Sequence, residues 1–284
     1  WKTVVFSGDL GRRAVPILHD PAPLPACDVL VCESTYGDRL HEATDPKEQL
    51  RRELSESFRR GGFTVIPAFA VGRTQEILYH LFELFEEGRL PKVPVYVDSP
   101  MANSVVELYC RYRSEHDVEM QELEDNVGSP LETPYFTVVR KRDESKKLND
   151  LPGPGVVVSA SGMATGGRVL HHLLHRLRDA RNTVLFVGYQ AEGSLGRRLL
   201  EGETEVTILG EGLTVKAAIK KIPALSAHAD ANEIIEWVKS APTPPKRVYL
   251  THGEPAAQDA FAARLRSELG LDVHVPEPDD VVEV

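Results

Sequence analysis

The chain has 284 residues, of which 42% are hydrophobic and 27% are charged, and its formal net charge is −10. This length and composition are typical of a folded protein with one large domain or two ordinary ones. The sequence contains no run of about eighteen apolar residues, so it predicts no membrane-spanning helix. The acidic balance argues against a general nucleic-acid binder, which is usually basic, but not against an enzyme that binds phosphates in a locally basic or metal-containing cleft.

The first residues, WKTVVFSGD, predict a strand rather than a signal peptide. Because the chain begins with Trp1 and not with Met, we expect it to have been cut from a longer protein. Cys27, Cys32 and Cys110 are scattered and form no CxxC pair. They indicate reduced, packed thiols, and we expect a cytoplasmic location without a membrane partner.

Short apolar segments rich in Val and Ile alternate along the chain with segments of helical periodicity, which predicts an α/β protein with buried strands. The first predicted helix has Asp45 as N-cap and Pro46 in its first turn. The polar segment 143–154 is predicted to be a loop. The predicted strands are 3–7, 29–32, 64–67, 93–97, 156–159, 183–187, 206–209 and 247–251, and the predicted helices are 45–60, 75–85, 169–177, 231–238 and 258–269.

The domain organisation is predicted to be that of a host domain with an insertion. Residues 45–180 form a self-contained series of strands and helices. The segments before and after it, 1–44 and 181–284, are shorter and carry isolated acidic or His residues at strand ends. We therefore expect these two segments to build one host domain around an inserted domain.

Four apolar strands are each followed by a polar residue that can carry chemistry. Asp9 follows VVFSG and Glu33 follows VLVC, while LSAHAD contains His228 and RVYLTHGE contains His252. Loops at strand ends are free to converge, so reactive groups collect there. One carboxylate and one imidazole suit zinc, and a second such pair can serve as acid and base. A single residue of this kind is often only a turn or cap, and Asp230 could equally be the N-cap of the next helix.

Six ordered motifs, SGDLGR, ESTYGD, SASGMATGGR, GYQAEGSLG, SAHAD and THGE, resemble those of the β-CASP nucleases. This family includes the pre-mRNA 3′-end cleavage endonuclease and ribonuclease J, and the resemblance extends from Phe6 to about Glu254. It implies a metallo-β-lactamase αββα sandwich, here partial, with a β-CASP domain inserted at 45–180 and an RNA-metabolising motif within 181–284. It also implies zinc-dependent hydrolysis of single-stranded RNA, with two zinc ions per site.

The resemblance also implies a role for each matching residue. Asp9 corresponds to the carboxylate that bridges two zinc ions and takes part in catalysis, and His252 corresponds to a terminal zinc ligand. Glu33 corresponds to the acid that orients a catalytic histidine. His228 corresponds to that histidine, which protonates the departing oxygen.

Two glycine-rich segments precede predicted helices and carry an arginine. Backbone N–H groups at a helix start, together with an arginine, form a natural phosphate site. The alternative is a tight turn with a solvated arginine. The predicted RNA-binding residues are Gly72, Arg73, Ser161, Gly166, Gly167 and Arg168.

A group of histidines on the predicted helix 169–177 is interpreted differently. The site that His171, His172 and His175 would make is expected to have no acidic companion nearby, so we expect surface or packing residues rather than a metal site.

The main departure from the family pattern concerns the metal site. The family motif HxHxDH is absent, and a further His ligand would precede Trp1. We therefore expect the chain alone to be inactive and a longer parent protein to be active.

Alternatives remain open at this stage. The first is a catalytically inactive RNA-binding or scaffold subunit, and the second is a hydrolase of the same fold that acts on DNA or a small ester. The histidine at the third position of SAHAD favours RNA. The sequence leaves endonuclease or exonuclease action open, and is compatible with a homodimer or a partner in a processing complex.

Overall fold

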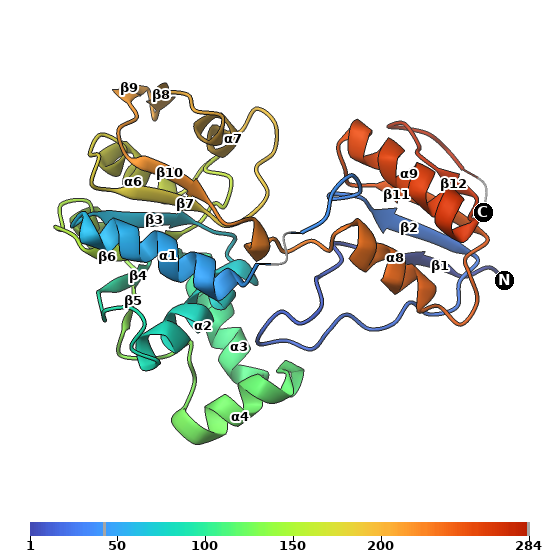
Figure 1. The fold of residues 1–284 in the computed structure, drawn as a ribbon, viewed down its shortest axis with the longest axis horizontal. Coiled ribbons are helices and arrows are strands. Elements are labelled where there is room, and N and C mark those ends of the chain that lie inside the picture. Colours follow the sequence, from blue (N-terminus) through green and yellow to red (C-terminus); the bar gives the residue numbers. More distant parts are fainter. Residues whose placement is uncertain (42–43, 283–284) are drawn as a thin grey trace. The chain divides into compact units, whose positions relative to one another are not determined.

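The computed structural model describes residues 1–41 and 44–282. The chain forms two compact units, and Figure 1 labels their elements. Unit 1 comprises Trp1–Val15, His19–Glu42 and Ala227–Val284, and unit 2 comprises Pro16–Leu18 and Ala43–Ser226. Each unit has its own sheet and its own core, so they are described one after the other.

Unit 1 contains a parallel four-stranded sheet in the order β1-β2-β11-β12. Alternate residues of the central strands, such as Leu30 and Leu250, pack with Ile234 and Phe261 of two helices. The register pairs the last residues of β2 and β11, so these strands end at the same edge. The elements are β1 (Val4–Phe6), β2 (Val29–Glu33), α8 (Ala231–Lys239), β11 (Arg247–Thr251), α9 (Pro255–Leu269) and β12 (Val273–His274).

Unit 2 is built on a parallel six-stranded sheet in the order β10-β7-β3-β6-β4-β5. An antiparallel hairpin of two short strands accompanies it. The strands of the sheet are β3 (Phe63–Pro67), β4 (Val95–Val97), β5 (Phe136–Val138), β6 (Gly155–Ser159), β7 (Thr183–Phe186) and β10 (Ala218–Lys221), and the hairpin is β8 (Glu205–Ile208) with β9 (Glu211–Thr214).

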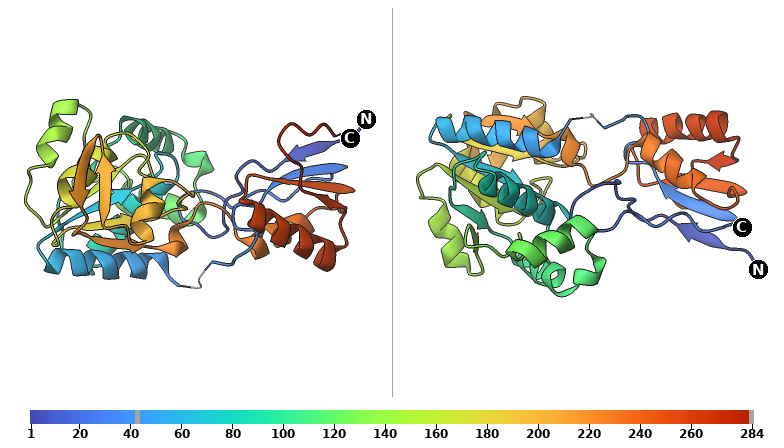
Figure 2. Two further views of the ribbon diagram at one scale, coloured as in Figure 1. Left: turned by 90° about the horizontal axis from the view of Figure 1, so that it is seen from above. Right: turned by 60° about the horizontal axis from the view of Figure 1, so that its bottom comes forward.

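Helices cover both faces of the unit 2 sheet, as the two views of Figure 2 show. In β6, Val156 and Val158 belong to one core and Val157 to the other, because successive side chains of a strand point to opposite faces. No helix among the described residues has both the length and the apolar character needed to cross a membrane. The first core includes residues of α1 (Pro46–Arg59), α2 (Arg73–Glu86), α3 (Pro100–Arg111) and α4 (Val118–Val127), and the second includes residues of α5 (Arg142–Leu148), α6 (Val169–Arg176) and α7 (Leu195–Leu200).

Every predicted strand and helix is present, and the bounds of β11 are those expected from sequence. Two predictions need correction. The segment 143–154 is not all loop, because α5 begins at Arg142 and ends at Leu148. The domain boundary expected near residue 180 also differs from the compact units, because β7 and β10 join the sheet of unit 2, which extends to Ser226.

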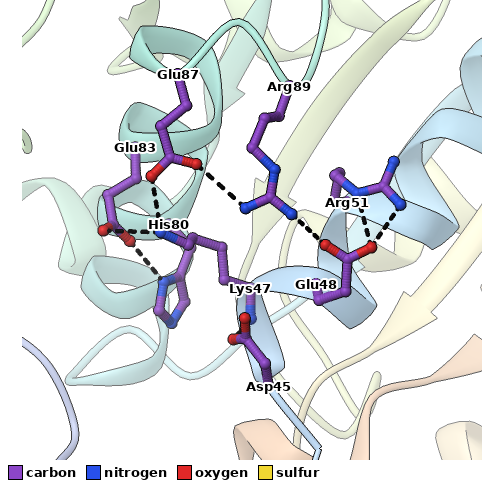
Figure 3. A network of polar contacts seen from close by, with 8 residues as sticks. All are labelled: Asp45, Lys47, Glu48, Arg51, His80, Glu83, Glu87 and Arg89. Atoms are coloured by element: carbon purple, nitrogen blue, oxygen red, sulfur yellow. Dashed lines mark hydrogen bonds and ion pairs between the residues drawn. The ribbon is translucent and has the colours of Figure 1, made fainter.

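A polar network joins α1 to α2 (Figure 3). The ammonium group of Lys47 donates to Glu83 Oε1 at 3.1 Å and to Glu87 Oε1 at 2.9 Å. Burial favours a raised pKa for Glu83, but hydrogen bonds from His80 and Lys47 outweigh it and lower the pKa of this carboxyl. The network therefore stabilises unit 2 most when these carboxyl groups are ionised.

We expect Lys47→Met to lower the free energy of unfolding at pH 7 by about 1 kcal/mol. A carboxyl whose pKa is lowered on folding contributes stability above its unfolded pKa, about 4.3 for Glu, and loses it as the pH falls through the folded pKa. The difference between variant and wild type should therefore shrink below about pH 4. Urea denaturation at pH 7 and at pH 3.5 measures it. Lys239→Met, which breaks an exposed ion pair with Glu236, is the matched control. An equal loss at both pH values would contradict the proposed role of the network.

Candidate metal centre and catalytic site

The sheet of unit 1 brings the four predicted chemical residues to one edge. Glu33 is the last residue of β2, His252 directly follows β11, and Asp9 lies just beyond β1. These strands are adjacent and parallel, so their carboxyl ends meet. His228 precedes α8 and reaches the same edge through a bridge to Gly11.

Glu33 and His228 form a hydrogen-bonded pair. The distance from Glu33 Oε2 to His228 Nδ1 is 2.9 Å, and the two side chains are 1% and 17% exposed. Leu10 N donates to the other oxygen of Glu33, and Thr35 Oγ1 donates to Oε2 at 2.7 Å. Because a carboxylate only accepts, the proton of the pair lies on Nδ1, and the imidazole acts on a substrate through Nε2. The geometry suits a proton donor with a fixed orientation.

Asp9 and His252 lie beside this pair and offer a metal-binding set of donors. Asp9 Oδ1 is 3.4 Å from His252 Nδ1, and ligand atoms of Asp9, His252 and His228 all lie within 4.8 Å of one another. Two ligands of one tetrahedral zinc ion with bonds of about 2.0–2.1 Å are separated by about 3.4 Å. A carboxylate oxygen and imidazole nitrogens are also donors that zinc prefers. The residues present therefore fit a zinc ion.

The turn that carries His252 is packed tightly against β2. His252 has φ of 51°, in the left-handed region. A Cβ at Gly253 would lie 2.5 Å from Ser34 Oγ and 2.7 Å from Ser34 O, so only glycine fits there. Ser34 Oγ also donates to Thr251 O at 2.8 Å. These contacts fix the direction in which the chain leaves β11 and thereby position the imidazole.

Two supporting residues were not singled out from the sequence. Thr35 Oγ1 lies 3.0 Å from the carbonyl oxygen of His252 and 3.2 Å from its Nδ1. The buried ring of His41 donates from Nε2 to the carbonyl oxygen of His228 at 2.9 Å. Thr35 lies within the ESTYGD motif, which could have indicated it, whereas His41 stands in a polar segment without a signal.

Asp230, for which two roles were open, is the N-cap of α8. Its side chain accepts from the backbone N–H groups of Asn232 and Glu233, and it forms a capping box with Glu233. Its second oxygen accepts from His41 N at 2.8 Å. Asp230 thus holds the segment around His228 in place.

The surroundings of Arg73 do not favour its predicted role in phosphate binding. Gly72 caps α2 with φ of 73°, so the expected glycine turn before the helix is present. The Arg73 side chain, however, is only 3% exposed and its guanidinium is paired with Glu76. A buried, paired guanidinium is not presented to a phosphate, and a contact of Gly72 with RNA stays a prediction.

The second glycine-rich segment is also ordered by internal contacts. Thr165 N donates to Ser161 Oγ at 3.1 Å, and a Cβ at Gly167 would lie 2.8 Å from Ala160 O. The half-buried Arg168 donates to Asp98 Oδ1 at 2.7 Å and to the carbonyl oxygen of Arg140 at 3.0 Å. RNA contacts of Ser161, Gly166, Gly167 and Arg168 stay predictions, and Arg168 has a structural role as well.

His172 has an acidic partner that its neighbouring sequence does not reveal. Its Nε2 is 2.7 Å from Asp98 Oδ2, and both side chains are buried. Burial favours a raised pKa for Asp98, but hydrogen bonds from His172, Ser145 and Arg168 outweigh it and lower the pKa. The expected absence of an acidic companion was therefore wrong, and His172 is a packing residue. His171 and His175 are exposed.

We expect Arg168→Gln to lower the free energy of unfolding by about 2 kcal/mol, because the buried Asp98 carboxylate loses a charged hydrogen-bond donor. Thermal and urea denaturation measure the loss. Arg181→Gln, which breaks an exposed pair with Asp179, should change stability little. The opposite result, unchanged stability with a slope of log K against log salt reduced by about 0.7 for single-stranded RNA, would assign Arg168 to phosphate binding instead.

Comparisons with known proteins agree with this fold. The β-CASP domain model matches residues 74–199, and the model of a Zn-dependent metallo-hydrolase RNA specificity domain matches residues 212–276. The chain belongs to the β-CASP family of the metallo-β-lactamase fold. The family and fold expected from the six motifs are thus confirmed.

Three curated relatives illustrate this membership. Ribonuclease TTHA0252 of Thermus thermophilus is 42% identical over 89% of this chain and 58% of its own length. An RNase J-like protein of Methanocaldococcus jannaschii is 33% identical over 97% of this chain and 64% of its own length. Transcription termination factor FttA of Methanosarcina mazei is 31% identical over 95% of this chain and 44% of its own length. The chain thus spans about half of the length of these relatives.

Proposed function

We propose that the protein is a zinc-dependent ribonuclease that hydrolyses phosphodiester bonds of RNA at the edge of the unit 1 sheet. The observation that carries the proposal is the hydrogen-bonded pair of Glu33 and His228 beside the zinc-compatible pair of Asp9 and His252. The matched metallo-hydrolase RNA specificity model and the relative named as a ribonuclease support the choice of RNA.

The residues of the site would divide the work as follows. Asp9 and His252 would hold zinc, and a carboxylate with two oxygens can contact two ions, so we propose two per site. Bound zinc would act as a Lewis acid and supply a nucleophilic water at neutral pH. Glu33 would keep the His228 proton on Nδ1 and stabilise the positive charge of the doubly protonated ring. His228 would give its Nε2 proton to the leaving oxygen.

The substrate would be single-stranded RNA, which can enter a site without its bases first being separated from a paired strand. The three free cysteines support a reducing compartment, so a cytoplasmic location remains part of the proposal. We also propose that the protein forms a homodimer or binds a partner in a processing complex. No contact among the described residues favours one of these over the other.

A cleavage assay with chelator and zinc tests the proposed function. End-labelled single-stranded RNA should be cut by the longer parent form that is expected to be active, cutting should stop with a chelator, and added zinc should restore it. A DNA oligonucleotide of the same sequence and a small ester serve as parallel substrates. Binding of RNA with zinc present but without cleavage would replace the enzyme by a scaffold. Faster cleavage of DNA or of the ester would move the protein to another substrate class.

A further inference from the structure

An aromatic residue is exposed at the carboxyl edge of the unit 2 sheet. Phe69 follows the end of β3 by two residues and is 41% exposed. Its backbone is fixed, because Phe69 O accepts from Thr74 N at 3.2 Å and from Thr74 Oγ1 at 2.8 Å. The ring is therefore presented to solvent from a defined position, and its surroundings decide what it can bind.

The backbones of two glycines support the ring of Phe69. A Cβ at Gly162 would lie 2.9 Å from Phe69 Cδ2 and 3.0 Å from Cε2, so a side chain at this position would displace the ring. A Cβ at Gly188 would lie 3.8 Å from Cε2 and 4.0 Å from Cδ2 of the same ring. One side of the ring thus faces both glycines, and the remainder of the ring accounts for its exposure.

A buried amide holds the two glycines in place under the ring. Gln190 is 2% exposed, and its Nε2 donates to Gly162 O at 3.0 Å. The same nitrogen is also within hydrogen-bonding distance of Gly188 O, at 3.3 Å. The segments that follow β6 and β7 are thereby joined, and the ring rests on a surface that the fold has already ordered. A site that is ordered in advance loses little conformational entropy when a ligand binds.

The ring lies at the switch point of the sheet. β3 and β6 are neighbours, and Phe69 and Gly162 follow their carboxyl ends. The chain leaves β3 through α2 toward β4, beyond β6, and leaves β6 through α6 toward β7, on the other side of β3. The two helices pack on opposite faces, as the separate cores of Leu78 and Leu173 show. Open parallel sheets bind ligands at the carboxyl ends of strands where the connections diverge in this way.

The loop that contains Gly162 also offers polar groups. Thr165 is exposed, and its Oγ1 is 3.1 Å from Ser161 Oγ. The backbone N–H groups of Gly166 and Gly167, which precede α6, donate no hydrogen bond to any residue that the structure describes. An aromatic ring supplies a face for a base, and hydroxyl and N–H groups suit the oxygens of a sugar-phosphate backbone. This combination favours a nucleotide over a purely apolar ligand.

We propose that Phe69 stacks on a base of single-stranded RNA at the carboxyl edge between β3 and β6. Unpaired bases commonly stack on aromatic side chains, and this contact tolerates any sequence because every base has a π-face. The proposal rests on the RNA substrate proposed above and names the residue of unit 2 that holds one of its bases. Every residue involved belongs to unit 2, so binding can be tested without zinc chemistry.

Fluorescence anisotropy of a labelled adenylate hexamer measures binding to the full chain, with chelator present so that no cleavage interferes. We expect Phe69→Leu to weaken binding by about fivefold or more, the lower end of the contribution of one stacked base. Phe69→Trp should bind at least as tightly as wild type. The slope of log K against log salt should stay unchanged in both variants, because stacking releases no counterions. Tyr112→Leu, which removes another exposed aromatic residue of unit 2, is the matched control and should not change the affinity.

An abasic hexamer with the same sugar-phosphate backbone separates stacking from other roles of the ring. It should bind wild type and Phe69→Leu equally, because it offers no base. An equal loss for both oligomers would show that Phe69 only shapes the loop and would overturn the proposal. Unchanged binding of the adenylate hexamer in Phe69→Leu, with the fold retained by circular dichroism, would also overturn it, as would no binding of this hexamer to wild type.

The outcomes of this experiment and of the cleavage assay are independent. Base-dependent binding through Phe69 in a protein that cuts no RNA would support the stacking site and overturn the proposed hydrolysis. Cleavage of RNA without any effect of Phe69→Leu on binding would support the hydrolysis and overturn the stacking site.

Discussion

His228→Ala in the complete enzyme is expected to slow RNA cleavage by about 10²–10⁴-fold, the usual contribution of a positioned general acid, while the zinc content of the protein stays unchanged. The reason is the hydrogen bond of 2.9 Å between His228 Nδ1 and Glu33 Oε2, which directs the ring as an acid and not primarily as a ligand. Single-turnover cleavage of a labelled RNA measures the rate, and elemental analysis measures zinc.

Two further observations decide between acid and ligand for His228, whose ring also lies within reach of Asp9 and His252. Glu33→Gln keeps the shape of the pair but removes the charge that stabilises the protonated ring, so it should also slow cleavage without loss of zinc. An RNA with a better leaving group, such as a 3′-thio linkage at the cut site, should recover much of the lost rate in His228→Ala. Loss of zinc in His228→Ala would instead make this histidine a ligand.

His252→Ala is expected to remove bound zinc and to lower cleavage by more than about 10³-fold, because the site would lose a direct zinc ligand. Asp9 Oδ1 lies 3.4 Å from His252 Nδ1, so Asp9→Ala should have the same effect. Zinc is measured by elemental analysis after dialysis, and cleavage is measured with and without added zinc.

His274→Ala is the matched control for the loss of His252. His274 is an exposed histidine on β12 of the same unit, and it is paired with Asp272. Its replacement should leave zinc and cleavage unchanged. If His252→Ala kept its zinc while losing activity, the residue would act on the substrate and the metal would lie elsewhere.

The local features of the sequence predict most of the elements, because buried parallel strands and capped helices leave clear patterns. Arg247–Thr251 is apolar and β-branched, and it forms β11 with these bounds. The helix Arg142–Leu148 escapes this approach, since only Ser145 and Leu148 of its seven residues are buried and no apolar period appears. Its charged first residues predict a loop, and only its packing against the sheet shows that it is a helix.

The site was predictable to the extent that each residue ends a strand or lies in a motif. Asp9, Glu33 and His252 meet because adjacent parallel strands end together, which the order of strands decides and the sequence alone does not state. The other differences from the prediction depend on which side chains are buried, and the local sequence does not show this. Arg73 follows a glycine turn as expected, yet its guanidinium is buried against Glu76. Asp98 and His172 pair across 74 residues of sequence, so no local pattern announces them.

The domain boundary illustrates a further limit. The expected end near residue 180 lies between α6 and β7, where one β/α repeat is complete. The sheet of unit 2 nevertheless takes up β7 next to β3 and β10 next to β7. A local composition change cannot show how many repeats one sheet collects, because further strands are stabilised by hydrogen bonds to partners far away in the chain.

The pairing of β2 with β11 has a consequence for how the protein forms. Ser34 and Thr251, joined by a hydrogen bond, are 217 residues apart, and unit 2 lies between them in the sequence. During synthesis on the ribosome, β2 cannot pair with β11 until the whole of unit 2 has been synthesised. A disordered segment of that length would make the closure entropically costly, whereas a folded one holds its ends at a fixed separation. We therefore expect the proposed metal site to assemble after unit 2 has folded, and substitutions that delay this folding to reduce the yield of zinc-loaded protein without altering a ligand.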